Sequence, residues 1–305
     1  MAQPTSQIIA QTTYPAFIQR SVGILLVAAS AAAFGTLAIF GRYAYAAGMD
    51  AMTILFLRFA LAAVVLLALL ILRREPLPRG RALAPLIGMG AIGYVGQAFC
   101  YLTALNYASS GLVALLLYLY PAFVTILSVV VLHERMTRLK VIALVLALVG
   151  TGLTIGPAGG QLVGILLALS AAGIYSIYII VGAQVMKQLS AVQSSTVIMA
   201  AAGAMTGVLL FFNGPHWPTT LGGWGAVAGI VIVATVLPAM TFLIGLRRIG
   251  PTNAAMISTL EPVVTVLLAA WLQGERLQLL TLAGGMLILG AVLLLTQSEL
   301  RRGGS

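Results

Sequence analysis

Charged side chains are scarce in this sequence. Only 7% of its 305 residues are Asp, Glu, Lys or Arg, whereas a soluble domain carries about 25% charged residues. A soluble fold cannot cover its surface with so few charges, so the composition excludes an ordinary water-soluble domain.

Residues that bind metals or nucleotides are equally rare. The single cysteine, Cys100, lies in an apolar run and permits no internal disulfide, while His133 and His216 are far apart in sequence. The chain also lacks a Gly-x-x-x-x-Gly-Lys-Ser/Thr loop for ATP and a His-Glu-x-x-His motif. We therefore expect no metal and no cofactor, and we expect that the chain is not an enzyme.

Apolar residues, by contrast, make up 61% of the chain, with a mean hydropathy of +1.10. They form separate runs of roughly 20 residues, the length that a helix needs to cross a bilayer. We predict an all-α polytopic membrane protein with ten transmembrane helices. The expected helices cover about residues 21–46, 51–72, 83–106, 110–132, 138–155, 161–183, 192–213, 222–246, 252–273 and 279–297. Residues 1–20 show no charged segment followed by a short apolar core, so the first run is expected to be a retained helix.

The basic residues indicate how the chain crosses the membrane. The net charge is +10, but Lys and Arg sit between the apolar runs and form no basic face, so nucleic-acid binding is not expected. With a cytoplasmic N-terminus, thirteen of the 16 basic residues fall in cytoplasmic segments. We predict a multi-pass protein of the inner membrane with both termini cytoplasmic. The thirteen are Arg20, Arg73, Arg74, Arg79, Arg81, Arg135, Arg138, Lys140, Lys187, Arg247, Arg248, Arg301 and Arg302.

An internal repeat relates the two halves of the chain. At an offset of 141 residues, the run 23–26 (Gly-Ile-Leu-Leu) matches 164–167, and Pro121 matches Pro262. Five helices per half is an odd number, so the second half enters the membrane from the opposite side. The sequence therefore predicts a 5+5 inverted-topology repeat, with repeats at 21–155 and 161–297, as in transporters that alternate between inward and outward openings.

A paired motif accompanies this repeat. Tyr120-Pro121 is followed by Glu134-Arg135, and Glu261-Pro262 is followed by Glu275-Arg276. This pattern resembles the EamA domain of the drug/metabolite transporter superfamily, present twice. Within that superfamily the whole sequence is most similar to YddG-type exporters of aromatic amino acids and methionine. Tyr120 departs from the family pattern, in which Glu is common before the first proline.

Several polar residues fall in the expected membrane spans. An ionisable residue at that depth costs at least about 2.5 kcal/mol, so Glu261 and Arg58 require compensation by a partner or a functional role. Pro121 and Pro262 are expected to kink their helices near the midplane. Glu134, Arg135, Glu275 and Arg276 are interpreted as structural loop anchors. The candidate substrate-binding residues are Arg58, Tyr94, Gln97, Tyr101, Tyr120, Tyr175, Tyr178, Ser258 and Glu261.

These residues favour a secondary carrier that moves a small-molecule substrate by alternating access. Ordinary interhelical hydrogen bonding remains the alternative reading of each polar residue. The YddG-like resemblance implies export of neutral aromatic amino acids and methionine. A drug or nucleoside exporter, a sugar-phosphate antiporter, a channel and an intramembrane enzyme are the alternatives. The sequence leaves the coupling ion and the oligomeric state open, and a monomer is compatible with it.

Overall fold

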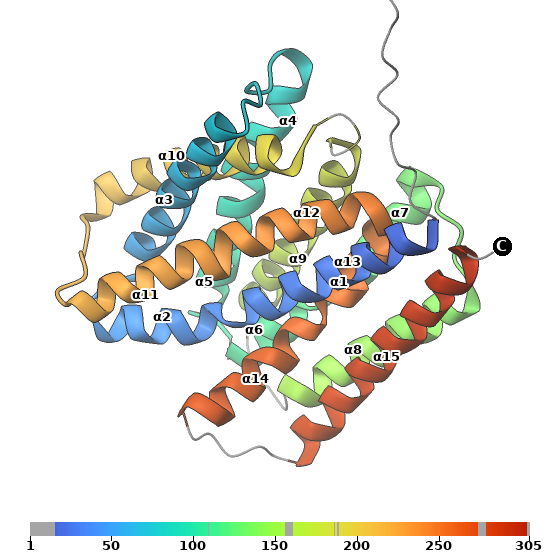
Figure 1. Cartoon of the computed structure of the whole chain (residues 1–305). Helices are drawn as coiled ribbons and strands as arrows, with labels where there is room; N and C mark the ends of the chain where they lie inside the picture. Colours follow the sequence, from blue (N-terminus) through green and yellow to red (C-terminus); the bar gives the residue numbers. More distant parts are fainter. Residues whose placement is uncertain are drawn as a thin grey trace, which may run out of the picture.

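The computed structural model describes residues 16–108, 110–155, 161–185, 187, 189–273 and 279–303. Every regular element in these ranges is helical, so the structure agrees with the all-α expectation. Figure 1 shows the helices packed in one bundle, with the first and last helices beside each other.

The first half of the chain forms the helices of residues 16–155. Several expected spans are divided into two or more consecutive elements. They are α1 (Ala16–Gly35), α2 (Leu37–Ala46), α3 (Ala51–Leu72), η1 (Gly80–Ala82), α4 (Leu83–Gly88), η2 (Met89–Tyr94), α5 (Val95–Ala104), α6 (Ser110–Leu117), α7 (Tyr120–Leu132) and α8 (Arg138–Ile155).

The second half repeats much of this order. Its elements are α9 (Leu162–Val185), α10 (Ala191–Asn213), α11 (Leu221–Val231), η3 (Ile232–Val236), α12 (Leu237–Ile249), α13 (Pro251–Ser258), α14 (Leu260–Gln273) and α15 (Leu279–Gly303).

Nine segments of the described ranges are long and apolar enough to cross a membrane. The one expected helix that is not among these nine is the fifth, 138–155, which forms α8, has 18 residues and lies along α15 (Figure 1). The nine segments are Ile18–Ala46, Ala51–Leu72, Gly80–Ala104, Leu112–Leu132, Leu162–Val185, Ala191–Asn213, Leu221–Ile249, Pro251–Leu272 and Leu279–Gln297.

Local sequence signals explain where several helices begin and end. The Asp50 side chain caps α3 by accepting a hydrogen bond from the Thr53 backbone N–H at 3.1 Å. Ser190 and Gln193 form a reciprocal capping box at the start of α10. Gly214 and Gly250 follow α10 and α12 with φ values of 75° and 80°, a conformation that favours glycine.

Interruptions of the helices occur at related positions in the two halves. The break at Tyr118 and Leu119, between α6 and α7, corresponds at the 141-residue offset to the break at Thr259, between α13 and α14. The π-helices η2 and η3 overlap at the same offset. Because π-helical turns are rare and concentrate at functional sites, η2 and η3 indicate that a functional site lies in the middle of the bundle.

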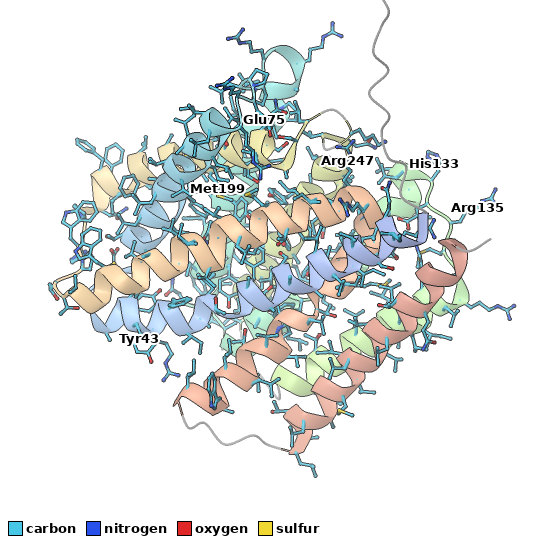
Figure 2. All side chains as sticks on the ribbon, in the orientation of Figure 1. Tyr43, Glu75, His133, Arg135, Met199 and Arg247 are labelled. Atoms are coloured by element: carbon cyan, nitrogen blue, oxygen red, sulfur yellow. The ribbon has the colours of Figure 1, made fainter. Side chains whose placement is uncertain are left out.

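One end of the bundle gathers the basic loops, and we call it the basic end. Thr252 Oγ1 donates to Glu134 Oε2 at 2.7 Å, which joins the end of α7 to the start of α13. The Ser190 hydroxyl similarly joins the start of α10 to Glu75, beyond the end of α3. In Figure 2 the labelled Glu75, His133, Arg135 and Arg247 lie toward this end, and Tyr43 lies at the opposite end.

Candidate functional site

Arg58 lies on α3 and points into the bundle with only 9% of its surface exposed. Its Nε donates a hydrogen bond to Thr235 Oγ1 at 2.8 Å, and its guanidinium lies 5.1 Å from the centre of the Phe59 ring. The hydrogen bond orients the guanidinium fork, whose terminal nitrogens supply further donors in a geometry that matches a carboxylate.

Tyrosine rings continue from Arg58 across the interface of η2 and α9. The Tyr94 ring centre is 5.3 Å from that of Phe59 and 5.1 Å from that of Tyr178. Tyr178 stacks on Tyr175 at 5.9 Å, since the two residues share one face of α9. This row presents apolar ring faces and hydroxyl groups together in the interior of the bundle.

The two breaks before the prolines adjoin this row. Tyr120, at the start of α7, is 2% exposed, and its ring centre lies 4.8 Å from that of Tyr175. Its hydroxyl donates to the carbonyl oxygen of Ala255 on α13 at 3.3 Å and has the Ser258 side chain as a hydrogen-bonding neighbour. The break before Pro121 therefore packs against the half-helix that precedes Pro262.

Glu261 lies in the first turn of α14, immediately after the second break. It lies within electrostatic range of the Arg58 guanidinium and of the side chains of Tyr118, Tyr120 and Tyr101. Thr265 Oγ1 donates to the Gly35 carbonyl oxygen at 3.1 Å, which places α14 against the break between α1 and α2. Glu261 thus lies where three interrupted helices meet, namely α1 with α2, α6 with α7, and α13 with α14.

We define the central cluster as the side chains that these contacts bring together. Arg58 and Glu261 act on each other through space, and the described ion pairs do not include a direct bridge between them. The tyrosines lie around and between the two charges. The cluster consists of Arg58, Tyr94, Tyr118, Tyr120, Tyr175, Tyr178, Ser258 and Glu261.

The remaining candidate residues occupy other places. Gln97 is half-buried on α5, one turn beyond Tyr94. Glu134 binds the buried ammonium of Lys140 at 2.6 Å, in addition to Thr252, and Arg135 beside it is exposed. Glu275 and Arg276 lie outside the described residues.

Three residues of the neighbourhood were missed by sequence reasoning: Phe59, Tyr118 and Thr235. The repeat carried a signal for Thr235, because this residue corresponds to Tyr94 at the 141-residue offset, and both positions approach Arg58. Phe59 and Tyr118 carried no comparable signal, since an aromatic residue in an apolar run is typical of any membrane helix.

The arrangement suits a zwitterion with an apolar tail. A guanidinium can bind a carboxylate through parallel hydrogen bonds, a carboxylate can accept from an ammonium group, and tyrosine rings can enclose an aromatic or thioether side chain. In the described ranges no group of three or more His, Cys, Asp or Glu residues can hold a metal ion.

Comparisons with known proteins agree on the kind of protein. The EamA-like transporter family matches residues 21–156 and again residues 162–297. An uncharacterized transporter of Bacillus subtilis, YcbK, is 26% identical over 281 residues, which cover 87% of this chain and 90% of YcbK. The pseudopaline exporter CntI of Pseudomonas aeruginosa is 25% identical over 289 residues, which cover 91% of this chain and 96% of CntI.

The fold also has a counterpart among solved structures. A crystal structure of a protein with 23% identity aligns with a TM-score of 0.80, covering 90% of this chain and 98% of that one. At this identity the likeness shows the fold alone. The two family matches together span nearly the whole described bundle, and the chain is a membrane transporter that belongs to the EamA-like transporter family.

Proposed function

We propose that this transporter is a secondary exporter of neutral amino acids with large apolar side chains, namely the aromatic ones and methionine. The central cluster carries the proposal, because it places one base, one acid and several tyrosine rings together inside an apolar bundle. Arg58 would bind the carboxylate, Glu261 the ammonium group, and the tyrosines the side chain.

Charge balance favours this substrate class over a sugar phosphate. A phosphate brings about two negative charges at neutral pH and requires several convergent cations in a dry site. Arg58 is the one basic residue in the central cluster, and Glu261 beside it would repel a second negative charge. A zwitterion leaves no charge unpaired.

We further propose ten crossings arranged as a 5+5 inverted repeat, with α8 as the fifth crossing. The correspondence of the breaks and π-helices at one offset supports the repeat, as does the pairing of α8 with α15 and of α3 with α10. The name of CntI supports the export direction. With basic residues held inside, the basic end faces the cytoplasm of a bacterial cell and the protein resides in the inner membrane.

Cysteine labelling tests this orientation. On a Cys100→Ala background, Arg79→Cys at the basic end should react with an impermeable maleimide only in inverted membrane vesicles. Asn213→Cys, at the opposite end of α10, should react only in intact spheroplasts, because one crossing separates the two ends. Labelling of both cysteines from the same side would refute the ten-crossing topology.

Counterflow in proteoliposomes tests the substrate. Vesicles loaded with unlabelled phenylalanine should accumulate labelled phenylalanine, and external tryptophan or methionine should compete with it. Apolar walls discriminate by only about 1–3 kcal/mol per methylene-sized difference, so overlapping selectivity is expected. Protein-free liposomes are the control. If hexose phosphates compete and these amino acids do not, the substrate assignment is wrong, while the carrier architecture stands.

A further inference from the structure

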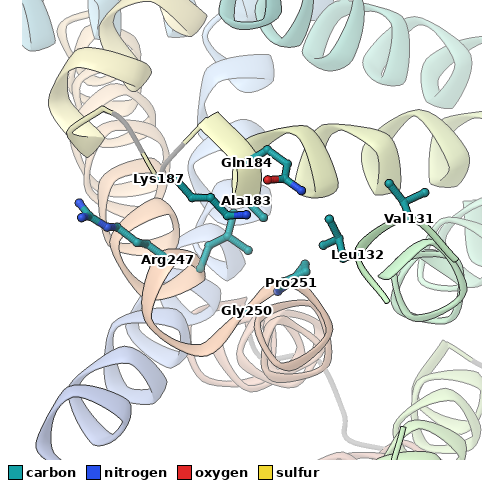
Figure 3. A pocket seen from close by; sticks show the side chains of 9 residues that line it. Val131, Leu132, Ala183, Gln184, Lys187, Arg247, Gly250 and Pro251 are labelled. Atoms are coloured by element: carbon teal, nitrogen blue, oxygen red, sulfur yellow. The ribbon is translucent and has the colours of Figure 1, made fainter. Parts of the chain in front are cut away.

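A cavity opens at the basic end, separate from the central cluster. Its volume is about 330 Å³, and its walls include Leu132, Ala183, Gln184, Lys187, Arg247 and Pro251. Figure 3 shows these side chains around the opening, with Lys187 extending over it toward Ala183 and Arg247 reaching outward from its side.

Two of the surrounding helices lead from this cavity to the central cluster. On α9, six residues separate Gln184 from Tyr178, which corresponds to about 9 Å along the helix axis. On α13, seven residues separate Pro251 from Ser258, or about 10 Å. A solute in the cavity therefore lies roughly two helical turns from the tyrosines, along the same two helices.

The charges around the cavity favour an anion. Lys187 and Arg247 each contribute one positive charge, and no acidic residue is among the described lining residues. The C-terminal ends of α7, α9 and α12 and the N-terminal end of α13 also border it. Each helix C-terminus carries a partial charge of about −0.5 elementary charge and each N-terminus about +0.5. The four helix ends together therefore offset only about half of the positive charge of Lys187 and Arg247.

We propose that this cavity is a carboxylate-recognition site at the cytoplasmic entrance of the transport path, where Lys187 over the opening and Arg247 at its side attract the carboxylate of the substrate before the substrate reaches Arg58. The inference rests on the proposed function for the identity of the substrate. The attraction of an organic anion to the cavity does not depend on that identity, because it follows from the residues that line the cavity.

The attraction of an organic anion is tested without any transport substrate. On a Cys100→Ala background, Gln184→Cys places a thiol in the cavity wall. Relative to their rates with a free thiol, an anionic methanethiosulfonate reagent should react about tenfold faster there than a cationic one. Lys187→Gln with Arg247→Gln should abolish this preference. The matched control, Arg79→Gln with Arg81→Gln, removes two exposed charges of the same end that do not line the cavity and should preserve it.

The carboxylate part is tested with phenylalanine and phenylalaninamide, which differ at the carboxylate. Phenylalanine should slow modification of Gln184→Cys, and the amide should not. In proteoliposomes of known orientation, Lys187→Gln with Arg247→Gln should lower kcat/KM for phenylalanine about tenfold in both directions, as the equilibrium of a passive carrier requires. From the basic end this fall should appear as a rise in KM, and from the opposite end as a fall in kcat. An equal rise in KM from both ends would overturn the entrance role.

The outcomes separate the two proposals. If anionic reagents are preferred in a charge-dependent way but phenylalanine is neither transported nor protective, the proposed substrate fails and the anion site stands. If phenylalanine is transported and the reagents show no charge preference, the entrance site fails and the proposed function stands. Loss of the preference in the control variant as well would also overturn the site.

Discussion

Phenylalanine counterflow is expected to fall about 100-fold when Glu261 is replaced by Gln. The substitution keeps the size of the side chain but removes the charge that balances both Arg58 and the substrate ammonium. Leaving a buried charge without compensation costs about 3–5 kcal/mol. Because a factor of ten corresponds to about 1.4 kcal/mol, a 100-fold loss requires only part of that cost. Initial rates per mole of monodisperse protein give the measurement.

A matched control and a double variant make this result specific. Asp50→Asn removes an acid outside the central cluster, and because Asn is also a good helix cap, transport should change by no more than about twofold. Arg58→Gln combined with Glu261→Gln should cost less than the product of the two single losses, since no uncompensated charge then remains. Strictly multiplicative losses would show that the two residues are not coupled.

Gly90→Ala is expected to lower the melting temperature more than any other single-methyl addition in η2. A Cβ at Gly90 would lie 2.2 Å from the backbone oxygen of Ile198 and 2.8 Å from the Cβ of Ala201, so η2 and α10 would have to move apart. Overpacking of this kind costs about 1–3 kcal/mol or more. The melting temperature is measured in detergent by heating samples and quantifying the folded protein that remains by size-exclusion chromatography.

Gly88→Ala is the matched control for this prediction. Gly88 lies two residues earlier, at the end of α4, and a Cβ there meets nothing within 4 Å. Because alanine has the higher helix propensity by up to about 1 kcal/mol, Gly88→Ala should be neutral or slightly stabilising. Equal melting temperatures for the two variants would contradict the close packing of η2 on α10.

Hydropathy alone located the helices, because each crossing needs about 20 apolar residues and each loop needs breakers or charges. The expected ranges 51–72 and 138–155 coincide with α3 and α8, and 110–132 has the outer bounds of α6 and α7 together. The outer bounds of the other expected ranges differ from the observed ones by a few residues, and several of these ranges are divided into two or more elements. A helix that crosses lipid must be long enough and must contain few polar residues. The positions of the helices can therefore be predicted from the sequence without knowing how the helices pack.

The interruptions inside the helices could not be predicted in the same way. The break at Thr36 between α1 and α2 has no proline, and η2 and η3 change the hydrogen-bond pattern of the backbone without changing hydropathy. Tertiary packing creates these features. Gly35, for example, lies against Val264 and the backbone oxygen of Glu261, a contact between residues that are far apart in sequence.

The candidate site was predictable only in part for a related reason. Depth along a helix follows from the number of residues, so Arg58, Glu261 and the mid-helix tyrosines could be proposed from the sequence. Which side chains touch across helices depends on helix rotation and packing, and the contact of Arg58 with Thr235 follows from the arrangement of α3 beside η3.

The paired π-helices also bear on how this chain arose. A π-turn accommodates one additional residue within an α-helix, and η2 and η3 carry it at overlapping positions of the two repeats. A single insertion in an ancestral five-helix gene, followed by duplication and fusion, accounts for both turns at once. With the inverted topology proposed above, the ancestor would then have assembled as two separate copies in opposite orientations, each already bearing the bulge, before one polypeptide joined them.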